Sequence, residues 1–149
     1  MSASEYHYTE SGLDSVYLVN GYKIVERPQG NKIVIQDIDG LHKAIGRSLV
    51  SEKKRLSGKD IRFLRNELLM SQAALAQLLQ VDEQTVARWE KGRTKIPGNA
   101  SVMLRVMYLE HIGDNEKISD LLRKIADIED RIDRKISLEE TNGSWDLAA

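Results

Sequence analysis

Residues 71–92 read SQAALAQLLQVDEQTVARWEKG and contain two short stretches in which apolar residues recur at helical spacing. The first stretch is mostly small and aliphatic, whereas the second sets Val86 and Trp89 among charged and amide side chains. Only a tight turn fits between them, and Ala76 supplies the small residue that two steeply crossing helices need at their contact. The segment predicts two packed helices, the second of which has a polar outer face.

The sequence around this segment repeats one kind of helix start. Ser57 and Asp60 have the spacing of a capping box, and apolar residues flank the start as a hydrophobic staple would. Ser71 and Asp82 repeat the staple 14 and then 11 residues further on, and Pro97 opens a fourth helical stretch. We therefore expect an all-helical bundle over residues 55–113. The staple pairs are Leu56 with Ile61, Met70 with Leu75, and Val81 with Val86.

The combination of Ser-Gln, Leu-Ala, Val-Asp and Arg-Trp-Glu-Lys-Gly within residues 71–92 closely resembles the Xre/Cro-like helix-turn-helix transcriptional regulators. The resemblance covers about residues 57–112, and it implies a DNA-binding protein whose second motif helix enters the major groove. Gln80 departs from the family, which usually has glycine there in a left-handed turn. A residue other than glycine costs about 1 kcal/mol in that conformation.

The polar face of the second motif helix carries the residues that we expect to read bases. A major groove about 12 Å wide admits one α-helix, and only its N-terminal half and outer face reach base edges. Gln84 and Arg88 lie four residues apart on one face, and these residue types pair with adenine and guanine through two hydrogen bonds. Thr85 and Glu83 complete the set. Glu83 can accept from cytosine, or its charge can instead favour the helix start.

The resemblance also implies contacts with the DNA backbone. Ser71 and Gln72 stand at the start of the preceding helix, and a polar cluster follows the second one; these residues would grip phosphates and supply affinity. In the alternative interpretation, Arg88 pairs with Glu90 or another acid and the whole face is only solvated. The cluster consists of Lys91, Arg93, Thr94 and Lys95.

The charge of the chain is divided along its length, although the net charge is only −1. Residues 53–95 contain ten Lys or Arg and five Asp or Glu, a local charge of +5, so the remainder carries −6. A basic segment within an acidic protein is typical of a phosphate-binding surface.

Composition excludes several other classes of protein. Because the 149 residues include no cysteine, disulfides, thiolate zinc sites and cysteine nucleophiles are excluded, and the three histidines lack metal-ligand spacing. No apolar run approaches the ~18 to 20 residues that span a bilayer. We expect no enzyme activity, no cofactor, no metal and no membrane partner, and a soluble protein that is cytoplasmic and associated with the nucleoid.

The remaining segments predict an α+β fold that is mainly α. Residues 1–14 are expected to be flexible, and residues 15–54 to form a three-stranded meander and a helix, for dimerisation or partner binding. Asn20-Gly21 and Pro28 to Asn31 would make the turns of the meander. The helix would bury one face, made of Leu41, Ala44, Ile45 and Leu49.

Residues 114–140 have the pattern of an amphipathic helix, and residues 141–149 are expected to be a disordered tail. The helix either folds back on its own domain or forms a short coiled-coil seam between two copies. Its candidate dimerisation residues are Ile118, Leu121, Ile125, Ile128 and Ile132.

Two further resemblances concern the N-terminal part. TESGLDSVYLVNGY, residues 9–22, resembles the head of MqsA-type antitoxin regulators, although the paired zinc-binding cysteines of that family are missing. IVIQDIDGLH, residues 33–42, resembles the nucleophile loop of haloacid-dehalogenase-type phosphatases. Leu41 replaces the expected Thr and no parallel sheet is predicted, so we interpret Asp37 and Asp39 as turn and helix-start residues.

These observations predict a sequence-specific DNA-binding regulator of bacterial or phage type. The preferred hypothesis is a homodimeric repressor that binds an inverted repeat in double-stranded DNA. The alternative is the antitoxin of a type II toxin-antitoxin pair, which would bind a toxin protein and regulate its own operon.

Overall fold

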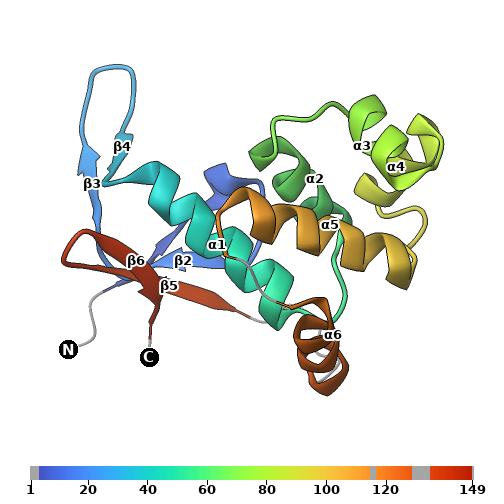
Figure 1. The fold of residues 1–149 in the computed structure, drawn as a ribbon. Coiled ribbons are helices and arrows are strands. Elements are labelled where there is room, and N and C mark those ends of the chain that lie inside the picture. Colours follow the sequence, from blue (N-terminus) through green and yellow to red (C-terminus); the bar gives the residue numbers. More distant parts are fainter. Residues whose placement is uncertain (1–3, 115–116, 129–134, 149) are drawn as a thin grey trace. The chain divides into compact units, whose positions relative to one another are not determined.

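The structure is a computed structural model that describes residues 4–114, 117–128 and 135–148 (Figure 1). The chain divides into two compact units. The β unit combines Met1–Ile45 with Asp133–Ala149, and the helical unit is Gly46–Ile132. Within the described ranges, no helix is both long and apolar enough to cross a membrane.

The fold is mixed α and β, and roughly half of the chain is helical. A short 3-10 turn, Thr9–Ser11, follows the first strand. The helices are α1 (Ile38–Glu52), α2 (Gly58–Glu67), α3 (Gln72–Leu79), α4 (Glu83–Glu90), α5 (Gly98–His111) and α6 (Ile118–Asp127). The strands are β1 (Tyr6–His7), β2 (Val16–Leu18), β3 (Tyr22–Val25), β4 (Lys32–Ile35), β5 (Ile136–Thr141) and β6 (Ser144–Leu147).

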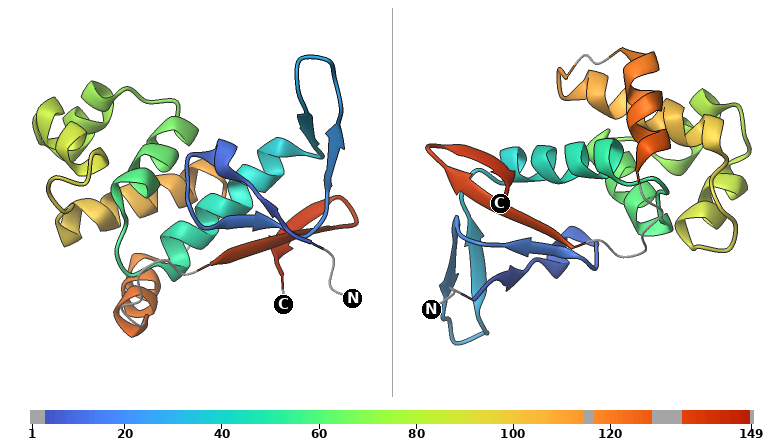
Figure 2. Two further views of the ribbon diagram at one scale, coloured as in Figure 1. Left: turned by 180° about the vertical axis from the view of Figure 1, so that it is seen from behind. Right: turned by 90° about the horizontal axis from the view of Figure 1, so that it is seen from below.

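The β unit joins strands from the two ends of the described chain in one four-stranded sheet of order β1-β2-β5-β6. β2 and β5 are parallel, although the whole helical unit lies between them in sequence, and the other neighbours are antiparallel. The views in Figure 2 show α1 crossing one face of this sheet. Alternate strand residues point to that face and form the core with α1 residues: Val16, Leu18, Ile136 and Leu138 with Leu41, Ala44 and Ile45.

The predicted three-stranded meander is wrong in its first turn. β2 pairs with β1 and β5 and not with β3, so Asn20-Gly21 does not close a hairpin. The Asn20 side chain instead donates to the Glu140 carbonyl at 3.2 Å and accepts from the Glu140 N–H at 2.7 Å. The second predicted turn is present: β3 and β4 form a separate antiparallel hairpin, with Gly30 N–H donating to the Arg27 carbonyl at 2.9 Å.

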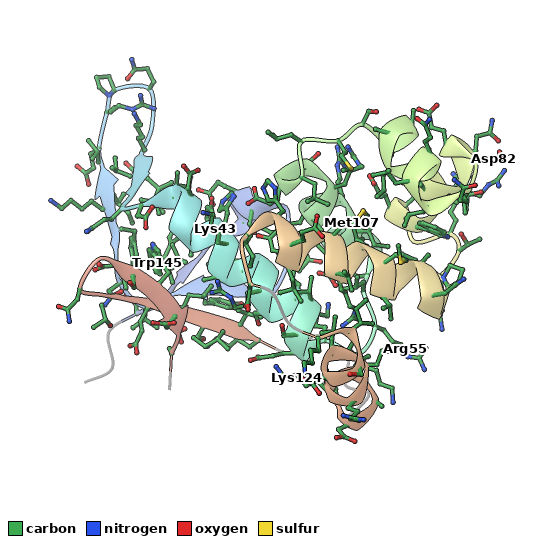
Figure 3. The ribbon with its side chains drawn as sticks, in the orientation of Figure 1. Lys43, Arg55, Asp82, Met107, Lys124 and Trp145 are labelled. Atoms are coloured by element: carbon green, nitrogen blue, oxygen red, sulfur yellow. The ribbon has the colours of Figure 1, made fainter. Side chains whose placement is uncertain are left out.

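The C-terminal predictions also need correction. The helix predicted to residue 140 ends at Asp127, and Ile136–Thr141 is a strand. The tail predicted to be disordered forms β6, because Asn142 and Gly143, with φ of 52° and 84°, make a tight turn back along β5. Trp145 is buried, and its indole N–H donates to the Gln36 carbonyl at 3.0 Å (labelled in Figure 3).

The described N-terminal residues 4–14 pack within the β unit, in contrast to the predicted flexible start. Tyr8 and Leu13 are buried, and the Tyr8 hydroxyl lies 2.8 Å from Nε2 of His42 on α1. Two aromatic contacts hold β1, one between Tyr6 and Tyr22 and one between His7 and Tyr17. The contacts of Tyr8 with His42 and of Tyr6 with Tyr22 join residues distant in sequence, which local patterning does not reveal.

The helical unit follows the predicted helix starts closely. Ser57 and Asp60 form the capping box at α2, and Ser71 Oγ accepts from the Ala74 N–H at 3.0 Å at α3. Asp82 occupies the N-cap of α4 but makes no side-chain capping hydrogen bond. Gln80 ends α3 in the left-handed conformation, with φ of 60° and ψ of 42°. The departure from glycine therefore places a strained residue at this turn.

A buried arginine joins the end of α1 to α5. Arg105 is fully buried, and its guanidinium donates to the carbonyls of Val50, Lys53 and Lys54 and to Ser101 Oγ. These carbonyls lie where a helix leaves its C-terminal acceptors unpaired. Burial lowers the pKa of Arg105 to about 10, which still leaves it charged at neutral pH. One side chain thus caps α1.

Candidate nucleic-acid interface

Helix α4 has one buried and one open face. Val86 and Trp89 are buried, whereas Glu83, Gln84 and Arg88 are exposed. Arg88 Nη2 lies 3.5 Å from Gln84 Oε1, so the two side chains share the face that their spacing predicted. Thr85 is half-buried. Figure 3 shows Asp82, at the start of α4, at the outside of the helical unit, among side chains that extend into solvent.

Close packing against α2 and α3 fixes the position of α4. Leu75 and Ala76 of α3 are buried, as the crossing of two helices requires. Gly58, at the start of α2, lies against the end of α4: a Cβ on this residue would be 2.4 Å from the Glu90 carbonyl oxygen. The backbones meet where no side chain fits, so α4 has little freedom to shift.

An ion pair that local sequence spacing does not predict also holds the end of α4. Arg65 donates from Nε and Nη2 to the two carboxylate oxygens of Glu90 at 2.6 and 2.9 Å, and from Nη1 to the Met70 carbonyl at 2.9 Å. The hydrogen bond to Glu90 raises the pKa of Arg65. Gln72 Nε2 donates to Glu90 Oε1 at 3.1 Å. Glu90 is therefore occupied by α2 and α3, and Arg88 does not pair with it.

Two groups of basic residues in this unit differ in their partners. Lys53 and Arg65 pair internally, with Asp60 and Glu90 respectively. Lys91, Arg93 and Lys95, just after α4, are exposed, and in the part of the chain that the structure describes no side-chain hydrogen bond or ion pair involves them. The second group, with exposed Thr94, leaves a compact positive segment next to the open face of α4.

The other residues that the sequence singled out lie outside α4. Ser71 is exposed at the start of α3, and Gln72 is half-buried with its amide N–H directed to Glu90.

Asp37 Oδ1 accepts from the Gly40 N–H at 3.1 Å at the start of α1, as a helix-start residue does. Within residues 4–114, 117–128 and 135–148, no group of three or more His, Asp or Glu is placed to hold a metal ion.

The predicted dimerisation residues do not share one open stripe in the structure. Ile118 is exposed and Ile125 is half-buried, but Leu121 is buried in its own chain. Ile128 lies after the end of α6 in an extended conformation, because the helix does not continue. Ile132 lies outside the described residues.

A comparison with protein-family models agrees with this geometry. The helix-turn-helix model matches residues 61–100, from the first turns of α2 into the start of α5. These residues are therefore similar to an Xre-like helix-turn-helix domain, and the match indicates a DNA-binding transcription regulator. No curated protein and no solved structure matches the chain. The match does not extend to residues 9–22, so the resemblance to MqsA-type regulators there stays a prediction.

Proposed function

We propose that the protein is a homodimeric repressor that recognises an inverted repeat in duplex DNA through α4. The observation that carries this proposal is the open face of α4, with Gln84 and Arg88 side by side and three exposed cations directly after the helix. A regulator of this kind needs side chains with hydrogen-bonding patterns that match base edges, and it needs nearby positive charge for phosphates. Both lie within residues 84–95.

The chemistry of each side chain predicts whether it would contact a base or a phosphate. Arg88 would donate two hydrogen bonds to a guanine, and Gln84 would donate to and accept from an adenine. Thr85 and Glu83 lie beside them, and Glu83 accepts from cytosine if it reaches a base. Phosphate contacts would come from Lys91, Arg93, Thr94 and Lys95, and from Ser71 and Gln72 at the start of α3.

Two copies would place their α4 helices in successive major grooves on one side of the duplex. The helices would lie about 34 Å apart, one turn of B-DNA, so the operator is expected to be an inverted repeat with half-sites at that spacing. Binding there would block access to a promoter, which is the simplest mechanism of repression.

Selection of bound sequences from a random DNA pool tests the proposal first. The enriched consensus should be palindromic. On that consensus, Arg88→Ala and Gln84→Ala should each lose about 1 to 3 kcal/mol of discrimination against a single base change. Fluorescence anisotropy with matched and mutated duplexes measures this directly. An Arg88→Ala protein that keeps its full sequence preference would refute the assignment.

The phosphate contacts have a different signature. Lys91→Ala, Arg93→Ala or Lys95→Ala should weaken binding to all duplexes alike, and each should reduce the slope of log affinity against log salt by about 0.9, because one phosphate is no longer neutralised. Lys117→Ala is the matched control, because Lys117 is exposed at the start of α6 in the same unit. Equal effects at Lys117 and Lys91 would mean that the cluster after α4 has no special role.

The antitoxin hypothesis remains a second candidate because one surface of the β unit is suited to a protein partner. The β3–β4 hairpin exposes Val25 and Val34 on one face, where they are 42% and 45% accessible, and Ile24 on the other face, where it is 55% accessible. Expression together with the product of any short open reading frame that neighbours its gene, followed by purification through a tag on this chain, tests the hypothesis. A stable heteromeric complex would support it.

A further inference from the structure

The β3–β4 hairpin is a cationic projection on an otherwise acidic unit. Residues 22–35 carry Lys23, Arg27 and Lys32 and only one acid, Glu26. None of the three cations takes part in an ion pair or side-chain hydrogen bond in the described parts of the chain. Figures 1 and 2 show the hairpin extending beyond the other strands of its own unit.

The pairing register defines what each hairpin face presents. Lys23 lies opposite Val34, and Val25 lies opposite Lys32, so these four side chains share one face. All four are exposed. On the opposite face Tyr22, Ile33 and Ile35 are half-buried, and Tyr22 packs against Tyr6 with ring centroids 5.3 Å apart, although Ile24 is 55% exposed. The open face therefore combines two valines with two lysines on a diagonal.

The outer face of the four-stranded sheet has the opposite charge. On this face β5 and β6 carry Glu139 and Asp146 and no Lys or Arg, whereas Glu140 alternates to the face of the buried Leu138. Glu139 lies directly opposite Asp146 in the register, and like charges in that position destabilise a sheet. The nearby Lys135 is already engaged, since it binds Glu5 at 2.8 Å and lies 4.7 Å from the centre of the Tyr17 ring.

We infer that the open hairpin face of one copy docks on the outer face of β5–β6 in a second copy. Lys23 and Lys32 would neutralise the opposed Glu139 and Asp146, and the two valines would be covered in the same contact. Diagonal positions on a hairpin are about 7 to 8 Å apart, and flexible lysine chains can converge from there on two neighbouring carboxylates. A twofold axis would make the contact twice, which doubles its area.

Charge complementarity favours a second copy over DNA as the occupant. Phosphates would satisfy the lysines but would leave the opposed Glu139 and Asp146 without neutralisation, whereas a second copy satisfies both sets of charges. The inference rests on the homodimer of the proposed function and names its interface. The test measures association without DNA, so its outcome is independent of base reading by α4.

A charge-swap experiment tests the inference on the full chain. In Lys23→Glu/Lys32→Glu, hairpin and sheet are both negative; in Glu139→Lys/Asp146→Lys, both are positive. Each variant alone should dimerise about 100-fold more weakly than the wild type, because like charges meet in the interface. An equimolar mixture should recover dimers, since both contacts then join opposite charges. Sedimentation equilibrium at low salt measures all four samples.

The controls separate charge pairing from loss of structure. Lys43→Glu/Lys117→Glu makes the same charge change at exposed positions outside the contact and should dimerise as the wild type does. Circular dichroism melts should show all variants folded. A monomeric wild type, a variant that dimerises normally by itself, or a mixture that stays monomeric would each overturn the inference. So would a Lys23→Glu/Lys32→Glu dimer of normal strength that binds DNA more weakly, because the hairpin would then be a DNA contact.

Discussion

The two units of the chain differ in how far apart in sequence the residues lie that determine their structure. In the helical unit, the signals for α2, α3 and α4 lie within a few residues of each helix, as the capping box of Ser57 and Asp60 illustrates. In the β unit, the central pairing joins Val16 to Ile136 and Leu18 to Leu138. Local chemistry therefore specifies the first unit, whereas the second depends on contacts between the two ends of the described chain.

The tryptophans offer the strongest test of this contrast, because Trp89 is buried in the helical unit and Trp145 in the β unit. Replacing either by alanine should cost about 3 to 5 kcal/mol through reduced burial and the cavity left behind. Trp145→Ala should remove hydrogen-exchange protection from β2 and β5, while the fluorescence of Trp89 keeps its urea midpoint. Trp89→Ala should do the reverse. Simultaneous loss of protection in both units would show that they unfold as one.

The same contrast explains what the sequence could predict. The helix starts and the shared face of Gln84 and Arg88 follow from spacing within one or two turns. The pairing of Arg65 with Glu90 does not, because 25 residues separate them and no periodicity connects them. The basic balance of residues 53–95 likewise overstated the free positive charge, because Lys53 and Arg65 pair internally.

The two Asn-Gly sequences show most clearly that contacts between residues distant in sequence decide what a local signal becomes. Asn142-Gly143 forms the hairpin turn that this dipeptide favours, with both residues at positive φ. Asn20-Gly21 has the same composition and also follows a strand, but its asparagine binds the Glu140 backbone and its glycine lies under Trp145. The alternation of Ile136, Leu138 and Trp145 around Asn142-Gly143 was the signal that could have predicted β5 and β6.

The ion pairs of the two units differ in how much of each side chain is exposed to solvent. The side chains of Arg65 and Glu90 are 12% and 5% accessible, whereas those of Lys135 and Glu5 in the β unit are 54% and 30% accessible. Glu90→Ala should lower the free energy of unfolding by about 3 kcal/mol, because it leaves a largely buried guanidinium without its carboxylate. Lys135→Ala should have a much smaller effect, since water and salt screen the exposed pair.

Urea unfolding of both variants measures this difference, and Glu90→Gln is the control that keeps the side-chain shape while removing the charge. Glu90→Gln should fall between wild type and Glu90→Ala. Equal losses for Glu90→Ala and Lys135→Ala would mean that the partly buried pair contributes no more than a surface pair.

Glycines lie at close approaches in both units, and Gly58 and Gly21 are one example from each. A Cβ at Gly58 would lie 2.4 Å from the Glu90 carbonyl oxygen, and a Cβ at Gly21 would lie 2.6 Å from the Trp145 ring. Each substitution by alanine should cost about 1 to 3 kcal/mol through overpacking, and at Gly21 the φ of 77° adds backbone strain. Gly98→Ala is the control, because nothing lies within 4 Å of its added Cβ. In thermal melts, the melting temperature of Gly98→Ala should be well above those of Gly58→Ala and Gly21→Ala.

The smallest expected effect concerns the left-handed residues that end an element in each unit. Gln80 closes α3 at φ 60° and Asn142 turns β5 into β6 at φ 52°. Gln80→Gly should raise the stability of the helical unit by up to about 1 kcal/mol, because glycine removes the Cβ strain, partly offset by a more flexible unfolded chain. Asn142→Gly should gain less, since asparagine adopts this conformation more readily than glutamine. Urea midpoints read from Trp89 and Trp145 fluorescence separate the two gains. A larger gain at Asn142 would mean that the strain lies in the β turn and that the Gln80 turn is already relaxed by its helix.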